Sequence, residues 1–173
     1  MVNEFSIQPS KLDEKEIEEA RALAESYFKT EESPDQMPTT KENSTWFRTA
    51  IPSCLQIIRH KKKIMGFGLI LPCTKKLMND FVSKKITEAE LFEAIKRTEA
   101  YKKREAIYFC SVFVQPAFRG KGLALKALTQ AITSTFDLSQ HPPLFYWAYS
   151  KEGDILAKKL SEQLDVPLYK RTE

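Results

Sequence analysis

The 173-residue sequence predicts a mixed α/β fold, in which one domain over residues 1–173 has a mixed central sheet flanked by helices. The uninterrupted apolar run at 106–114 is typical of a central strand with both faces buried. Two further apolar, β-branched runs at 54–59 and 63–71 lie on either side of a basic turn and predict a β-hairpin. Segments with apolar residues at helical spacing precede and follow these strands.

Composition excludes several other classes of protein. With 42% hydrophobic and 29% charged residues, the chain is neither disordered nor fibrous, and its length is enough for a core without disulfides or a structural metal. The three cysteines have no C-x-x-C spacing and the two histidines lie far apart, so we expect reduced thiols and no metal site. The apolar runs are too short to span a bilayer, and no signal pattern opens the chain. We therefore expect a cytoplasmic protein without a membrane partner.

The first part of the chain predicts two helices before the hairpin. Apolar residues at helical spacing after Ser10 predict an amphipathic helix over 11–29. A polar stretch with two prolines predicts a loop over 30–44, and a short second helix is expected to end before Pro52.

After the hairpin, helices and strands alternate. We expect Pro72 to end the second hairpin strand, and Thr87 with Glu90 forms a capping box within a helical stretch over 74–101. The remaining expected elements are a helix over 123–136, a strand over 144–149, a helix over 154–164 and a terminal strand over 166–170.

The segment from Val112 to Ala124 carries the chemistry. A buried strand ends at Pro116, a tight turn with Gly120 and Gly122 follows, and a helix begins at once. The first N–H groups of a helix lack intrahelical partners and the helix dipole favours negative charge there, so this turn predicts a binding site for a phosphate group. The spacing matches neither the P-loop nor the dinucleotide-binding pattern.

The turn resembles the acyl-CoA loop [Q/R]-x-x-G-x-[G/A] of the GNAT superfamily of N-acetyltransferases. Here it reads Arg119-Gly-Lys-Gly122-Leu-Ala124, preceded by Val114-Gln-Pro116-Ala-Phe118 where that family has V-x-P-x-[F/Y]. The order of elements also resembles that of the family. The resemblance implies a GNAT-like sheet with a helical insertion between its third and fourth strands and a shortened C-terminus, because the family's usual final strand is missing.

The resemblance implies acetyl-CoA as the acyl donor and direct attack by a primary amine, carried by a small molecule or a peptide. Backbone groups of Val112, Phe113 and Val114 are then expected to pair with the pantetheine arm. The backbone N–H groups expected to hold the pyrophosphate are those of Arg119, Gly120, Lys121, Gly122, Leu123 and Ala124.

The catalytic residues are less clearly marked. The family's last helix often carries a tyrosine that protonates the leaving thiolate, but the best match here places Asp154 at its asparagine and Ser161 at its tyrosine. Tyr149, water or no acid at all must then take that role. Tyr149 is the candidate acid, with packing beside Trp147 as the alternative for its side chain. The candidates for the base that the family often places on its central strand are Glu105 and Tyr108. Glu31 and Glu32, in the loop expected to roof the acceptor site, are further candidates.

Partners and alternatives follow from the charge distribution and the missing strand. Residues 1–36 hold ten acidic against four basic residues, which favours a cationic acceptor such as a polyamine, an aminoglycoside or a lysine side chain. One wall of the acceptor site is expected to be open or supplied by the second chain of a homodimer. The alternatives are a CoA-binding or regulatory module without catalysis and a nucleic-acid-associated protein, for which no recognition motif is present. We therefore expect no nucleic-acid partner.

Overall fold

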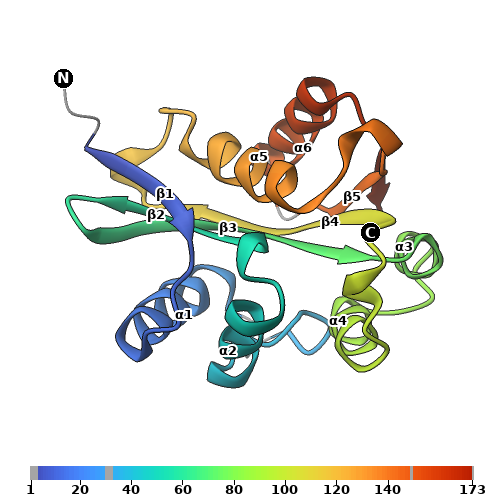
Figure 1. The fold of residues 1–173 in the computed structure, drawn as a ribbon, viewed down its shortest axis with the longest axis horizontal. Helices are drawn as coiled ribbons and strands as arrows, with labels where there is room; N and C mark the ends of the chain where they lie inside the picture. Colours follow the sequence, from blue (N-terminus) through green and yellow to red (C-terminus); the bar gives the residue numbers. More distant parts are fainter. Residues whose placement is uncertain (1–3, 30–32, 149, 173) are drawn as a thin grey trace.

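In the computed structural model, which describes residues 4–29, 33–148 and 150–172, a six-stranded sheet has the order β1-β2-β3-β4-β5-β6 (Figure 1). The first four strands are antiparallel to their neighbours, whereas β4, β5 and β6 run parallel. The strands are β1 (Phe5–Pro9), β2 (Leu55–His60), β3 (Lys63–Cys73), β4 (Ala106–Val114), β5 (Leu144–Trp147) and β6 (Leu168–Arg171). The helices are α1 (Glu14–Phe28), α2 (Lys41–Ala50), α3 (Lys75–Val82), α4 (Glu88–Arg97), α5 (Leu123–Thr135) and α6 (Lys151–Leu164).

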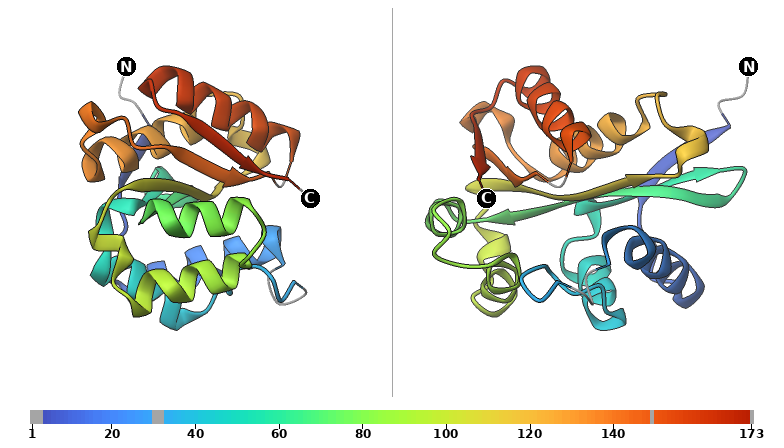
Figure 2. Two further views of the ribbon diagram at one scale, coloured as in Figure 1. Left: turned by 90° about the vertical axis from the view of Figure 1, so that its right-hand side faces the viewer. Right: turned by 180° about the vertical axis from the view of Figure 1, so that it is seen from behind.

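The helices form a layer on each face of the sheet. Helices α5 and α6 cover one face, and α1, α2 and α4 cover the other, with α3 packed near β5 and β6 (Figures 1 and 2). Of the helices in the described ranges, none is both long enough and apolar enough to cross a membrane. The sheet thus separates two helical layers.

A register shift in β4 decides which side chains face which layer. Leu69 pairs with Ser111 and Ile70 with Phe109, so Cys110 is an extra residue in β4. Tyr108 and Phe113 are five positions apart and would face opposite sides of a regular strand. Both instead contact the layer of α1 and α4, because the bulge reverses the alternation between them.

The parallel strands β4 and β5 separate beyond this bulge. Among the described residues, β5 pairs with β4 only at Ile107, Tyr108 and Phe109, whereas β4 continues to Val114. On its β3 side, β4 stays paired as far as Val114. The stretch from Cys110 to Val114 therefore has a strand edge turned toward a gap in the sheet, where extended backbone groups can pair with a bound molecule.

Two glycines let β3 lie close to its neighbours. A Cβ atom at Gly66 would stand 2.1 Å from the backbone oxygen of Phe113, so a side chain there would displace β4. At Gly68 a Cβ would lie 3.2 Å from Cβ of Ala127 in α5. The first glycine admits a neighbouring backbone and the second admits a helix, both beside the open end of β4.

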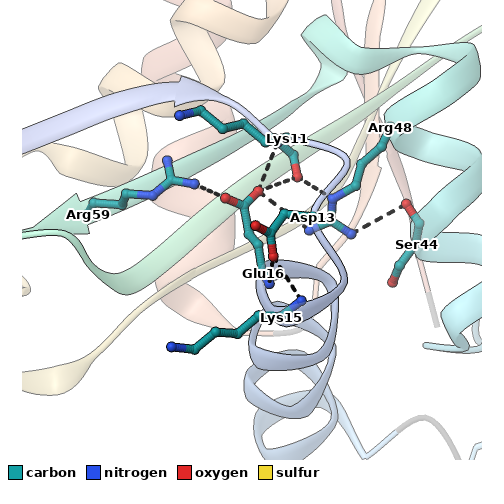
Figure 3. A network of polar contacts seen from close by, with 8 residues as sticks. Lys11, Asp13, Lys15, Glu16, Ser44, Arg48 and Arg59 are labelled. Carbon is teal, nitrogen blue, oxygen red and sulfur yellow. Dashed lines mark hydrogen bonds and ion pairs between the residues drawn. The ribbon is translucent and has the colours of Figure 1, made fainter.

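A largely buried charged network joins α1 and α2 to β2 and to the segment that follows β1 (Figure 3). The Glu16 carboxylate of α1 accepts from Ser10 Oγ and from the Lys11 N–H, each at 2.8 Å, and from the guanidinium of Arg59 in β2. Arg48 of α2 donates to Ser10 Oγ and lies 3.8 Å from Glu16. Glu16 is therefore the acidic group shared by two arginines.

Most elements expected from the sequence are confirmed, including β4 over 106–114 and the capping box of α4. The insertion between β3 and β4 consists of two helices, α3 and α4. Strand β1 was not expected, although Phe5 and Ile7 alternate with polar residues. The prediction that this strand ends at Pro72 was wrong, because β3 continues to Cys73. Strand β2 pairs with β3 only as far as Leu69, so the proline occupies a stretch with one strand neighbour, where its missing N–H is tolerated.

Two helices begin earlier than expected. Helix α2 starts at Lys41, within the segment expected to be a loop, because the Thr40 hydroxyl caps it by accepting from the Asn43 N–H. Helix α6 starts at Lys151 instead of 154, because the Ser150 hydroxyl accepts from the Gly153 N–H. The earlier start of α6 changes which of its residues face the gap in the sheet.

Candidate active site

The glycine turn presents backbone N–H groups at the beginning of α5. Gly120 and Gly122 have φ of +79° and +75°, a region that favours glycine, and Gly122 is the N-cap of α5. A Cβ at either glycine would meet no protein atom within 4 Å, so the turn faces open space. In the described chain, no backbone N–H of residues 120–125 donates to a protein acceptor. These donors fit a diphosphate.

A large cavity extends from this turn to the gap between β4 and β5, and we call it the donor cavity. Its volume is about 600 Å³. Residues of β4, of the glycine turn, of β5 and of α6 line it, together with Tyr27 and Phe28 from the end of α1. The predicted residues Val112, Phe113 and Val114 lie along one wall. The cavity thus joins the open strand edge to the N–H groups of α5.

The cations of the turn have different surroundings. The Arg119 side chain lies back over the strand, where its Nε donates to the Val114 carbonyl at 2.8 Å and its guanidinium lies 5.8 Å from the Phe113 ring. Arg119 and Lys159 of α6 line the donor cavity, whereas Lys121 is exposed beside it. Two cations on opposite walls add to the positive end of the α5 dipole.

A second cavity lies on the other face of the sheet, below the bulge of β4, and we call it the acceptor cavity. Its volume is about 100 Å³, and its lining is more apolar than polar, with apolar side chains from α1, β2, β3 and the loop before α2 and polar side chains mainly from that loop and α2. The residues that line both cavities are Phe28, Cys110, Ser111 and Trp147. The two cavities therefore approach each other at the bulge, where β4 and β5 separate.

Glu88 supplies a carboxylate to the acceptor cavity. It is the first residue of α4, and its two oxygens accept from the Met37 N–H at 2.8 Å and from the Tyr108 hydroxyl at 2.5 Å. Burial raises the pKa of Glu88 above its ordinary value, and the two hydrogen bonds oppose this shift. Burial and the neighbouring Glu88 raise the pKa of Tyr108 well above its ordinary value. The hydroxyl therefore stays protonated and donates to the carboxylate.

The candidate bases lie in different places. Tyr108 lies beside the acceptor cavity and contacts Glu88. Glu105 is exposed, accepts from the Lys75 N–H at the start of α3 at 3.1 Å and lines neither cavity. Tyr149, Glu31 and Glu32 lie outside the described residues.

The residues matched to the family's last helix do not meet the donor cavity. Ser161 donates to the Val166 carbonyl at 2.6 Å near the end of α6. Asp154 accepts from the Tyr146 hydroxyl at 2.7 Å and pairs with Lys170 at 3.0 Å, and these contacts lower its pKa. Because α6 begins one turn early, it lines the cavity with Gly153 and Leu156, next to its cap Ser150.

The cysteine at the bulge is not activated. Burial raises the pKa of the Cys110 thiol well above its ordinary value, and Glu88 acts in the same direction. A thiol held in this form is a poor nucleophile. Cys110 is therefore not poised to act as a nucleophile.

The family model described as "Acetyltransferase (GNAT) family" matches residues 17–152. The chain belongs to this family. Family membership identifies the protein as an N-acetyltransferase that uses acetyl-CoA as its acyl donor. No curated protein matches the chain in sequence.

Solved structures show the same fold at low sequence identity. A mosquito arylalkylamine N-acetyltransferase like 5b is 15% identical, with a TM-score of 0.54 over 90% of this chain and 82% of its own. The aminoglycoside N-acetyltransferase AAC(6')-Iy, solved with CoA, is 14% identical, with a TM-score of 0.52 over 98% of this chain and 91% of its own. The loading GNATL domain of CurA from Lyngbya majuscula is 16% identical with a TM-score of 0.47, and the match covers 76% of this chain but 58% of that one.

Proposed function

We propose that the protein transfers the acetyl group of acetyl-CoA directly to a primary amine. The observation that carries the proposal is the pair of cavities on opposite faces of the sheet, which share Cys110, Ser111 and Trp147. A donor held on one side and an acceptor held on the other would meet at the bulge of β4. Such a geometry brings the reacting atoms together without a covalent enzyme intermediate.

The residues of the donor cavity fit acetyl-CoA along its length. The backbone N–H groups from Gly120 to Leu125 would hold the diphosphate at the positive end of α5. The unpaired edge of β4 from Cys110 to Val114 would pair with the amide groups of the pantetheine arm. Acetyl-CoA supplies an acetyl group activated as a thioester, and the protein's part is to place it at the bulge.

Binding of acetyl-CoA is tested by thermal denaturation with and without the ligand. Acetyl-CoA is expected to raise the Tm of the wild type and to leave the Tm of Gly122→Glu unchanged, because a carboxylate there repels the diphosphate. Gly122→Ala is the matched control, because it adds about 1–2 kcal/mol of backbone strain but no charge. Gly122→Ala should have a lower Tm than the wild type, and acetyl-CoA should still raise that Tm. An unchanged wild-type Tm at saturating acetyl-CoA would count against the donor site.

Transfer is tested by measuring thiol release from acetyl-CoA with a panel of primary amines. The panel comprises butylamine, benzylamine, spermidine, kanamycin and a lysine peptide. We expect at least one amine to increase thiol release above the rate of hydrolysis, with the N-acetyl product seen by mass spectrometry. Binding of acetyl-CoA without transfer to any of these amines would refute the proposed reaction and favour a binding module.

A further inference from the structure

Glu88 is a carboxylate that lines a cavity and has no cationic partner there. Among the ion pairs between described residues, none includes Glu88. Its two hydrogen bonds come from neutral donors, the Met37 N–H and the Tyr108 hydroxyl. A carboxylate that is partly buried in this way is costly unless a cation joins it. The acceptor cavity therefore has a place for a positive charge beside Glu88.

The other charged groups near this cavity already have partners. Arg48 lies beside Glu16, and Arg21 pairs with Glu18 at 2.5 Å. Arg171, the nearest strand cation, donates from one nitrogen to the carbonyls of Phe81 and Ile86. Glu88 is thus the carboxylate of the cavity wall that is open to a bound cation.

The remaining wall restricts the body of that cation. The apolar lining includes Phe28, Met37, Phe47, Phe67 and Leu69. The cavity volume of about 100 Å³ is of the order of an apolar cavity that accepts benzene, about 150 Å³. Among the described residues that line the cavity, Glu88 is the one carboxylate, so these walls offer no partner for a second ammonium. They suit one ammonium group on a small apolar body.

We propose that Glu88 binds the ammonium group of the acceptor and takes its proton, and that the acceptor is a small monoamine with an apolar body. This inference rests on the proposed function and deepens it. It replaces Glu105 as the base with a residue from the inserted helix α4. It also narrows the acceptor away from the polyamines and aminoglycosides that the acidic N-terminal segment suggested.

The proton and bond changes balance with the groups named. The ammonium gives one proton to Glu88, and the neutral amine forms its bond to the acetyl carbon of the thioester. The C–S bond then breaks, the sulfur leaves with the electron pair, and the second nitrogen proton passes through solvent to the thiolate. Glu88 returns its proton to water, so the products are an N-acetylated amine, free CoA and one released proton.

The groups around Glu88 shift its pKa and thereby the pH dependence of the reaction rate. Tyr108 and Cys110 of β4, Met37 of the loop before α2, and Arg171 of β6 act on it. The Tyr108 hydroxyl donates to the charged form and stabilises it. Removing that hydroxyl should shift the acidic limb of the pH–rate profile to higher pH.

The experiment compares Glu88→Gln with Glu93→Gln, using butylamine and benzylamine as acceptors. Both substitutions remove one charge from α4, but Glu93 is exposed and pairs with Lys96. We expect kcat/KM for the amine to fall about 100-fold or more in Glu88→Gln, the typical contribution of a positioned base, and to stay near wild type in Glu93→Gln. The Tm rise with acetyl-CoA should persist in both, which shows that the fold and the donor cavity are intact.

The outcomes separate the two proposals. If the wild type acetylates an amine and Glu88→Gln does so equally well, the role of Glu88 is refuted and the proposed function stands. If the wild type acetylates spermidine or kanamycin at least tenfold better than benzylamine and butylamine, the apolar-body class is refuted. If the wild type acetylates no amine, both proposals fall. In Tyr108→Phe, an acidic limb at the wild-type pH would contradict proton transfer to Glu88.

Discussion

Replacing Glu16 with glutamine tests how much the charged network stabilises the packing of α1 and α2 against the sheet. The side chains of Arg48, Glu16 and Arg59 are 1%, 10% and 15% exposed, so the charges in this network are largely out of water (Figure 3). Burial lowers the pKa of the Arg48 guanidinium, and Glu16 opposes that shift. Neutralising Glu16 would leave the buried guanidinium of Arg48 and the largely buried guanidinium of Arg59 without the carboxylate that they share.

The expected cost follows from that burial. Breaking a buried ion pair by removing one partner costs about 3–5 kcal/mol, because the remaining charge is uncompensated. In a chain of this size each kcal/mol lowers Tm by about 2–4 °C, so Glu16→Gln should lower Tm by about 6–20 °C. The network already contains two buried nitrogens without hydrogen-bond partners among the described residues, on Arg48 and Arg59. Few other polar groups are therefore available to stabilise the two guanidinium groups once Glu16 is neutral.

The matched control is Glu18→Gln in the same helix. Glu18 is 58% exposed and pairs with Arg21, so losing it should cost about 1 kcal/mol or less. Thermal denaturation followed by circular dichroism measures both variants at one pH and salt concentration. If Glu16→Gln and Glu18→Gln lower Tm equally, or if Glu16→Gln stays within about 2 °C of wild type, the argument from buried charge is wrong.

Two further predictions concern the acceptor cavity. Because burial raises the pKa of Glu88, the folded protein binds a proton that the unfolded chain releases, and stability falls as pH rises above the ordinary carboxyl range. The Tm of Glu88→Gln minus that of wild type should therefore increase between pH 4 and pH 8, and a constant or decreasing difference would contradict this. Cys110→Ala should keep its rate of amine acetylation within about tenfold, whereas loss of a covalent nucleophile costs on the order of 10⁶-fold. A loss of that size in Cys110→Ala would indicate an acyl-enzyme.

The glycine turn was predictable because its information is local. A buried strand, Gly120, Gly122 and an immediate helix lie within one short segment, and a left-handed N-cap at Gly122 follows from that order. The expected elements near this segment, β4 and α5, have nearly the expected bounds. The predicted donor-binding residues line one cavity or lie beside it, and their contacts with acetyl-CoA remain predictions.

The acceptor side was not predictable in the same way. Glu88 looked like an ordinary acidic residue in the first turn of a capped helix, and that is also one of its roles. Its meeting with Tyr108 depends on how α4 packs beneath β4, twenty positions along the chain. One signal for this site was present in the sequence, since Tyr108 was itself a candidate for the base. Its hydrogen-bond partner, Glu88, is set by how the helical layer packs against the sheet.

The sequence by itself determined the fold class, the family resemblance and the glycine turn, because each depends on short-range spacing and backbone preference. Only the tertiary structure decided where the acceptor cavity lies, through the bulge at Cys110 that turns Tyr108 and Phe113 to the same face. A one-residue insertion in a strand pair has no marker in the apolar run of β4. Its consequence, a partly buried carboxylate beside the opening between two strands, exists only when the layers are assembled.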